Sequence, residues 1–565
     1  MKILSLQPVD LKKNMSIKTS WKFYLLLLFT FWFSNQIFAQ TLEDAIKAID
    51  KEEYSKAKTI LNTLISQNPK KPELYYYLGV ACFRDAKDIE EDKQRIPELE
   101  KAKDAYQKGI AANSKYAKNY AGLGEYYAFS RNLPEAKKNF DQALTLSNSN
   151  DLDVLVTVAE AYIAANVKDL SEATKLLTKA QNMDSKNEHV NLALGDVWLK
   201  QNVNELAKTY YEKAIAANAK SVIAHFKLGV LYVKMSDYKN GADMIMKALQ
   251  LDPSFAPAYR ELGELYFLAK DYKRAKENYQ EYVKRKQGDI QAEIRYATFL
   301  YLSKDYAAAV SQINQVLKTV ENNVLLRLLG YSNYEVGAAQ ASQPATEHYN
   351  NAKNALDKYF TRIDPKNIIA LDYEYYGHIL DKLGQDSLAV EYYEKAIAKD
   401  ATKYTLYSEI ADAWNSVKSY QKSIDALNKY IAINPIPEIY YKLGKMYYKQ
   451  KMYTEATAAY QKILEKKPDF LYAHFEIARC QAGLDPETSQ GLAKPHYEKV
   501  IELGEAAPDK YKKELIEAYV YMGYYLYLQK KFHDSLPYYE KVLTLDPEHK
   551  QATEMVPYLK KTKQP

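Results

Sequence analysis

The chain has 565 residues, of which 47% are hydrophobic and 13% aromatic, and this composition excludes an intrinsically disordered protein. Of the formal net charge of +6, residues 1–40 hold five lysines against one aspartate, which leaves +2 for the remainder. A nearly neutral body with interspersed signs lacks the basic surface of a nucleic-acid-binding protein, so nucleic acid is not an expected partner.

Residues 1–40 have the features of a signal peptide. Lysines precede an apolar run at 23–33, and the small residue Ala39 follows it. The run is short for a membrane span, which needs about 20 residues. We therefore expect a periplasmic or secreted protein, with an uncleaved membrane anchor as the alternative. Translation from Met1 or from Met15 leaves a complete signal peptide in either case.

Small residues recur at a fixed interval in the middle of the chain. Gly195, Gly229, Gly263 and Ala297 are spaced by 34 residues, and a second small residue follows each of them after twelve positions. Four positions further on stands a bulky residue, such as Tyr211. Apolar residues at helical intervals predict two amphipathic helices per repeat, which approach closely where the small residues meet. Neighbouring hairpins must stack to bury their apolar faces.

This pattern resembles the tetratricopeptide repeat, in which Leu-Gly, an aromatic residue, a small residue, a second aromatic residue and a closing proline recur in that order. The small marker is position 8 of the motif, and the bulky residue is position 24, where many of the 53 tyrosines fall. The fourteen markers are Ala45, Gly79, Gly124, Ala159, Gly195, Gly229, Gly263, Ala297, Gly330, Gly377, Ala411, Gly444, Ala478 and Gly523. The resemblance implies an all-α, right-handed superhelical solenoid of about fourteen helix-turn-helix repeats.

The marker spacing widens after Gly79, Gly330 and Ala478, where we expect surface insertions or longer helices. The second insertion, at 335–350, is rich in small residues and is also a candidate hinge. The expected organisation is an N-terminal array over 41–325, a C-terminal array over 326–550 that is continuous with the first or flexibly joined to it, and a short polar capping tail over 551–565.

The sequence holds no glycine-rich phosphate loop, no HExxH motif and no paired CxxC motif. Glu374 and His378 lie four residues apart on one predicted helix, but no third metal ligand accompanies them. Cys82 and Cys480 lie in different repeats, so a disulfide between them is not expected. We therefore expect a protein that is not an enzyme and that uses no cofactor or metal.

In the family, positions 2, 5, 9 and 12 of the first helices face a concave groove. Carried over by register, these positions imply a groove that is acidic early in the chain and aromatic and basic late in it. The candidate groove residues are Glu125, Glu160, Asp196, Arg260, Tyr441, Lys445, Phe475, Arg479 and Tyr524. The alternative is that these side chains are solvated helix residues without a ligand.

The resemblance and the export signal together predict a non-catalytic scaffold or adaptor of the cell envelope, which binds partner proteins or extended peptides in its groove. The alternative is a protein that binds envelope glycans or peptidoglycan fragments through the late aromatic stretch. We expect membrane association only through partners or an uncleaved signal anchor.

Overall fold

The computed structural model describes residues 40–89, 92–165, 167–286, 288–340 and 345–562. These residues form helices and turns and contain no strand. The predicted signal peptide lies outside the described residues, apart from Gln40, and so do residues 341–344 of the candidate hinge. Within the described ranges, no helix is both long and apolar enough to cross a membrane.

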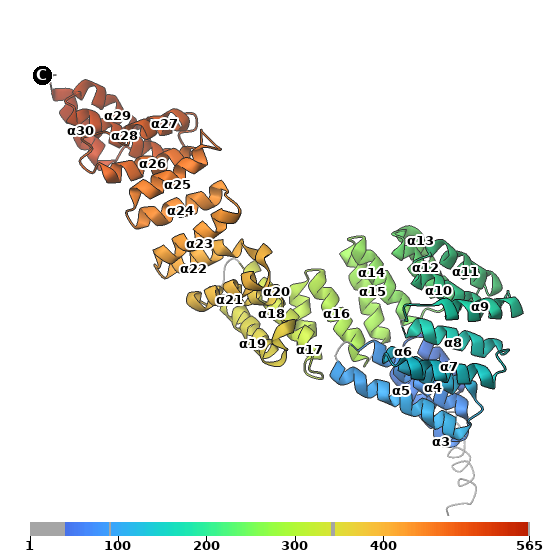
Figure 1. Cartoon of the computed structure of the whole chain (residues 1–565). Helices are drawn as coiled ribbons and strands as arrows, with labels where there is room; N and C mark the ends of the chain where they lie inside the picture. Colours follow the sequence, from blue (N-terminus) through green and yellow to red (C-terminus); the bar gives the residue numbers. More distant parts are fainter. Residues whose placement is uncertain (1–39, 90–91, 166, 287, 341–344, 563–565) are drawn as a thin grey trace, which may run out of the picture. The chain divides into compact units, whose positions relative to one another are not determined.

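The described α-helices, α2 to α30, alternate along the chain as first and second helices of repeats, and α30 closes the array (Figure 1). Within the described residues the two helices of a repeat pack against each other in thirteen pairs, which confirms the predicted all-α array of about fourteen repeats. The chain divides into two compact halves between Tyr296 and Ala297, inside α16 (Ile290–Leu302). We call these the N-terminal half and the C-terminal half. The division lies within repeat 8, whereas the sequence placed a boundary after that repeat, at residue 325.

The helices of the N-terminal half before α16 are α2 (Leu42–Asp50), α3 (Tyr54–Gln67), α4 (Pro72–Lys87), α5 (Asp92–Ala112), α6 (Ala117–Phe129), α7 (Leu133–Leu146), α8 (Leu152–Ala164), α9 (Ser171–Met183), α10 (Glu188–Lys200), α11 (Asn204–Ala217), α12 (Val222–Lys234), α13 (Tyr238–Leu251), α14 (Ala256–Leu268) and α15 (Tyr272–Arg285). The even-numbered helices are the first helices of repeats 1 to 7.

After α16, the C-terminal half holds α17 (Tyr306–Val316), α18 (Asn323–Ala339), α19 (Thr346–Arg362), α20 (Ala370–Lys382), α21 (Asp386–Lys399), α22 (Leu406–Ser416), α23 (Tyr420–Ile433), α24 (Pro437–Lys449), α25 (Tyr453–Leu464), α26 (Leu471–Leu484), α27 (Lys494–Gly504), α28 (Lys512–Leu528), α29 (Phe532–Leu545) and α30 (Lys550–Lys561). Two short 3-10 helices lie at Pro365–Asn367 and Ala401–Lys403.

The close approach of the two helices within a repeat depends on the marker residue. A Cβ atom added to Gly195 would lie 2.3 Å from Cε1 of Tyr211, whose side chain is fully buried. The same glycine–tyrosine pairing recurs in several repeats, whereas repeat 1 combines the marker Ala45 with Leu61 sixteen residues later. The ring needs the space that a glycine leaves, which explains why tyrosines accumulate at position 24.

We expect Gly195→Ala to lower the free energy of unfolding by about 1–3 kcal/mol, because the methyl group forces the Tyr211 ring out of its place. Urea unfolding of the full chain measures this loss. The double variant Gly195→Ala/Tyr211→Leu restores the alanine–leucine pairing of repeat 1. Its loss should therefore be smaller than the sum of the two single losses, and additive losses would contradict the packing argument.

The insertions mostly lengthen helices. Helix α5 has 21 residues, and α18 and α19 have 17 each, compared with 13 or 14 in most other repeats. The third insertion forms a loop after α26, where the buried carboxylate of Asp485 accepts hydrogen bonds from the backbone N–H groups of Ser489, Gln490 and Gly491. Extra residues are thus accommodated without interrupting the stack of helix pairs.

The segment predicted as a polar capping tail at 551–565 is helical as far as Lys561, where α30 packs against α29. Ala552, Val556 and Leu559 lie on one face of α30 and are buried. Their spacing of four and three residues is typical of one face of an α-helix. The charged residues between and after them lower the overall hydropathy of the segment, so the pattern was not recognised in the sequence. The helix covers the apolar face of the last repeat, as a terminal cap of a repeat array must.

Candidate functional site

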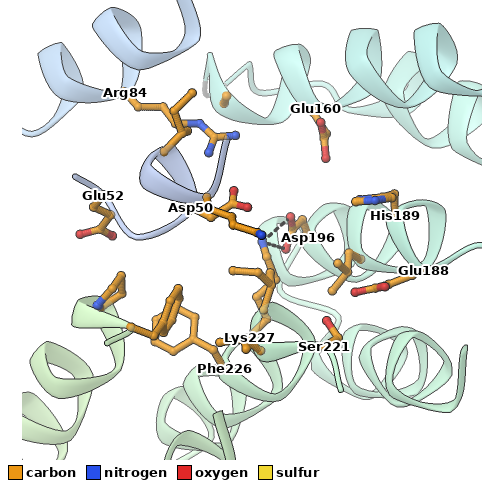
Figure 2. A pocket seen from close by; sticks show the side chains of 18 of the residues that line it. Asp50, Glu52, Arg84, Glu160, Glu188, His189, Asp196, Ser221, Phe226 and Lys227 are labelled. Carbon is orange, nitrogen blue, oxygen red and sulfur yellow. Dashed lines mark hydrogen bonds and ion pairs between the residues drawn. The ribbon is translucent and has the colours of Figure 1, made fainter. Parts of the chain in front are cut away.

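A cavity of about 700 Å³ lies inside the N-terminal half. First helices of repeats 1, 2, 4, 5, 6 and 7 contribute to its wall, so it lies on the concave side of the helix stack. Figure 2 shows Asp50 and Arg84 on one side and Glu160 and Asp196 on the other, all directed toward the open space. Two of the predicted groove residues, Glu160 and Asp196, therefore line this cavity.

Contacts between repeat 1 and repeat 7 close the N-terminal half around the cavity. Arg260 Nη1 on α14 lies 2.6 Å from Oε2 of Glu52, in the turn after α2. The neighbouring Lys51 lies 2.8 Å from the Asp252 carboxylate, and the Lys286 ammonium donates to the backbone carbonyl of Glu52. We call this set of contacts the seam. Arg260, predicted as a groove residue, lies in the seam with its guanidinium engaged.

The charged groups of the cavity fall into two classes. Lys227 Nζ lies 2.7 Å from an Asp196 oxygen, so these two charges neutralise each other. Arg84, Asp50 and Glu160 form no hydrogen bond or ion pair with any described residue. Burial raises the pKa of the Asp50 and Glu160 carboxyls, although both side chains are exposed to the cavity itself. The cavity therefore presents charged groups that are not engaged in hydrogen bonds or ion pairs with the described residues.

The residue after each marker, position 9, is a second recurring site. In repeat 5 the Tyr211 hydroxyl donates to the Asp196 carboxylate at 2.7 Å, and in repeat 7 the Tyr279 hydroxyl lies 3.4 Å from Glu264. The ring at position 24 thus supplies a partner for position 9 of the same repeat.

Repeats 3 and 4 lack this partner. Their position-24 residues are Phe140 and Leu177, which carry no hydroxyl group, and their position-9 residues are Glu125 and Glu160. Glu125 is only 9% exposed, and it has no hydrogen bond or ion pair with a described residue. Burial raises the pKa of its carboxyl to about 7.

The sequence did not identify Asp50 and Arg84 as cavity residues. Both occupy position 13, five residues after the markers Ala45 and Gly79, and position 13 is not among the family's groove positions. The signal was present as a pair of opposite charges at the same position of adjacent repeats. The position of these two side chains in the cavity wall depends on how tightly the repeats curve, and the spacing of the marker residues does not encode this curvature.

In the C-terminal half, four of the late candidate residues lie on α24 and α26. Lys445 Nζ lies 4.7 Å from the centre of the Tyr441 ring, and Arg479 Nε lies 3.4 Å from a Glu517 oxygen. Lys445 and Arg479 line a cavity of about 520 Å³. Phe475 is buried in the core of its repeat. Of the late residues, Lys445 and Arg479 are thus the ones on a concave surface with Tyr441 beside them.

Tyr524 is 38% exposed, and its ring stacks on that of Tyr527 with the centres 6.4 Å apart. Glu374 and His378 each have another partner, Lys403 at 2.6 Å and the Tyr393 hydroxyl at 3.0 Å. Among the described residues, no three metal-ligating side chains are grouped to hold an ion. Cys82 and Cys480 are both buried as free thiols.

Family models described as "Tetratricopeptide repeat" match residues 226–290, 376–400, 437–470 and 516–549. No curated protein sequence gives a significant match.

Among solved structures, the C-terminal part of a TPR repeat-containing protein from Cytophaga hutchinsonii is 33% identical, over 46% of this chain and 98% of that one, with a TM-score of 0.41. A tetratricopeptide repeat protein from Parabacteroides merdae is 16% identical over the same shares, with a TM-score of 0.32. The human IFIT1 dimer with m7Gppp-AAAA is 17% identical over 61% of this chain and 78% of that one, with a TM-score of 0.34. The repeat pattern, the family matches and the 33% identity over 98% of the Cytophaga hutchinsonii fragment agree, and the chain belongs to the tetratricopeptide-repeat proteins.

Proposed function

We propose that this protein is an exported, non-catalytic adaptor of the cell envelope, which holds extended segments of partner proteins on its concave faces. Tetratricopeptide-repeat proteins in general serve as scaffolds for protein interactions. The observation that carries the proposal is the cavity of the N-terminal half, where Arg84, Asp50 and Glu160 have no partner within the described residues. Export rests on the apolar run and lysines of residues 1–40.

The test uses the chain from residue 41 as bait for envelope proteins, with chemical cross-linking and mass spectrometry. We expect a reproducible set of partners. The double variant Lys445→Glu/Arg479→Glu should recover about five-fold less of any partner that binds the C-terminal half, because it reverses two charges on one concave surface. The matched control is Lys395→Glu/Lys462→Glu, on second helices, where both lysines form exposed ion pairs.

Equal recovery by the two double variants would contradict the role of Lys445 and Arg479 and leave the adaptor proposal in place. The absence of any specific partner would contradict the adaptor itself.

Glycan binding is the second candidate, favoured by the exposed rings of Tyr524 and Tyr558, which are 38% and 49% accessible. Sedimentation of the protein with purified cell wall tests it, and a protein that stays in the supernatant would dismiss it.

A further inference from the structure

The carboxyl group of Glu125 is an unusual feature of the N-terminal half. It is about nine-tenths buried, and no described residue gives it a hydrogen bond or an ion pair. Glu125 occupies position 9 of its repeat. In the next two repeats this position is held by Glu160 and Asp196, which line the cavity. Buried polar groups normally have partners, and burying an unpaired charge is costly. Glu125 therefore has binding capacity that the protein itself does not use.

The cations nearby do not compensate for this burial. Lys87 Nζ donates to the carbonyl oxygen of Ala164 at 2.7 Å, and the Arg84 guanidinium points into the cavity without a partner. The pKa values of both carboxyls are nevertheless raised, because desolvation outweighs the attraction of Lys87 and Arg84 for Glu125, and that of Arg84 and Lys227 for Glu160. A third positive charge placed between the two carboxyls would stabilise their ionised forms.

We propose that a lysine or arginine side chain from an extended segment of a partner protein enters this cavity beside Glu160 and reaches Glu125, so that the two carboxylates are its partners. Glu125 is not itself a lining residue; it occupies the same position in the repeat before Glu160, and Arg84 of the cavity wall acts on it electrostatically. The inference rests on the proposed function and specifies the class of partner. Phe226 and Ile163 in the cavity wall offer apolar contact to the aliphatic stem of such a side chain. Arg84 is free to donate hydrogen bonds to backbone carbonyl oxygens of the same segment.

An acidic segment fits the cavity less well. It would approach the carboxylates of Asp50 and Glu160, which have no cationic partner within the described residues, and that of Asp196. Lys227 offers it little attraction, because both Asp196 oxygens lie within 2.8 Å of its ammonium group. Like charges brought together at a binding surface lower the affinity and select against the wrong partner.

The experiment selects binders from a random dodecapeptide library on the chain from residue 41. Wild-type protein, the variant Glu125→Gln/Glu160→Gln and the matched control Glu135→Gln/Glu172→Gln are compared. The control changes the same residue type in the same two repeats, on the second helices, where Glu135 and Glu172 form ion pairs with exposed lysines. We expect lysine and arginine to be enriched with wild type and with the control, and this enrichment to be lost with Glu125→Gln/Glu160→Gln.

Calorimetry of one selected peptide provides the second readout. Its affinity should fall about ten-fold in Glu125→Gln/Glu160→Gln and stay within about two-fold in the control. Binding should also tighten from about pH 6 to about pH 8, because the cation favours the ionised form of a carboxyl whose pKa is about 7. Glu125→Gln alone should flatten this dependence. The groups that face Glu125 are Arg84, Lys87, Tyr76, Tyr106 and Glu160.

The fold of the variant is checked by its stability. In the free protein a pKa raised to about 7 means that ionisation of Glu125 costs stability above its ordinary pKa, and the full cost is present above about pH 7. Glu125→Gln should therefore be at least as stable as wild type at pH 8. A less stable variant would show that Glu125 has a structural partner, which would overturn the proposal.

The remaining outcomes separate the inference from the proposed function. Selected peptides without a preference for lysine or arginine, or a preference that survives in Glu125→Gln/Glu160→Gln, would overturn the inference and leave the adaptor function standing. A library and an envelope extract that both yield no binder would contradict the adaptor function as well.

Discussion

Replacing Asp372 with alanine is expected to lower the free energy of unfolding of the C-terminal half by about 3 kcal/mol. The carboxylate is fully buried and joins three consecutive helices. It accepts hydrogen bonds from the hydroxyls of Tyr331 on α18 and Tyr359 on α19, and from the backbone N–H of Ile369 before α20. Arg327 Nε lies 3.0 Å from Oδ1 of Asp372, the oxygen that also accepts from Tyr331. Alanine leaves the two hydroxyls and the backbone N–H without this acceptor and Arg327 without its counter-charge.

Urea unfolding followed by tyrosine fluorescence and circular dichroism measures this loss. The value is at the low end for a buried ion pair because the Arg327 side chain is 24% exposed and water reaches it. Asp372→Asn is the matched control, since its amide oxygen still accepts hydrogen bonds, and its loss should be smaller. A loss below about 1 kcal/mol in Asp372→Ala would contradict a cooperative network at this point.

The same network concerns the candidate hinge. Residues 341–344 lie outside the described residues, but Tyr331 and Tyr359 stand on the helices before and after them and bind one carboxylate. The two helices are also among the most extensively packed pairs of the chain. The small residues of the sequence suggest a hinge at 335–350. On either side of this segment, Tyr331 and Tyr359 bind the same carboxylate, and α18 packs against α19.

Replacing Arg260 with alanine is expected to loosen the seam. Its guanidinium lies 2.6 Å from Glu52 and 3.2 Å from Glu261, and the side chain is 12% exposed. Removing it leaves the Glu52 carboxylate without its cation. We expect the opening of α2 and α3 to become easier by about 2 kcal/mol, which corresponds to roughly 30-fold faster amide hydrogen exchange in these two helices.

Hydrogen exchange with mass spectrometry resolves this effect by segment. The control Arg274→Ala removes an arginine on the neighbouring α15 that is 57% exposed and pairs with Asp271 at 2.6 Å, and it should leave exchange in α2 and α3 unchanged. Glu52→Gln should accelerate the same peptides as Arg260→Ala. Unchanged exchange in all three variants would show that repeat 1 is held by its own neighbour, repeat 2, and not by the seam.

The repeat array was predictable because its packing is local in sequence. Gly195 and Tyr211 lie sixteen residues apart and touch each other, so the spacing in the sequence directly reflects the contact. Ala45 and Leu61 are likewise sixteen residues apart and belong to one buried core cluster, and Gly263 meets Tyr279 at the same interval. A motif of this kind identifies helices, turns and core residues together.

The cavity and the seam were only partly predictable because their contacts are remote in sequence. Glu160 and Asp196 were found through the family's groove positions, and both line the cavity. Arg260 was assigned to a groove by the same rule, yet its partner Glu52 lies 208 residues away and is reached only because the repeats curve back. That curvature is the sum of small rotations between repeats, and no single motif residue specifies it.

The seam has a topological consequence for any partner of the N-terminal half. A groove that is open along its length releases a bound chain sideways, whereas a chain that crosses a closed ring leaves only end-first or after the ring opens. The ion pairs of Glu52 and Lys51 would then have to break before a bound chain could leave sideways. They would govern how long a partner stays and whether a folded domain at its end blocks its escape, while the residues in the cavity determine which sequence is retained.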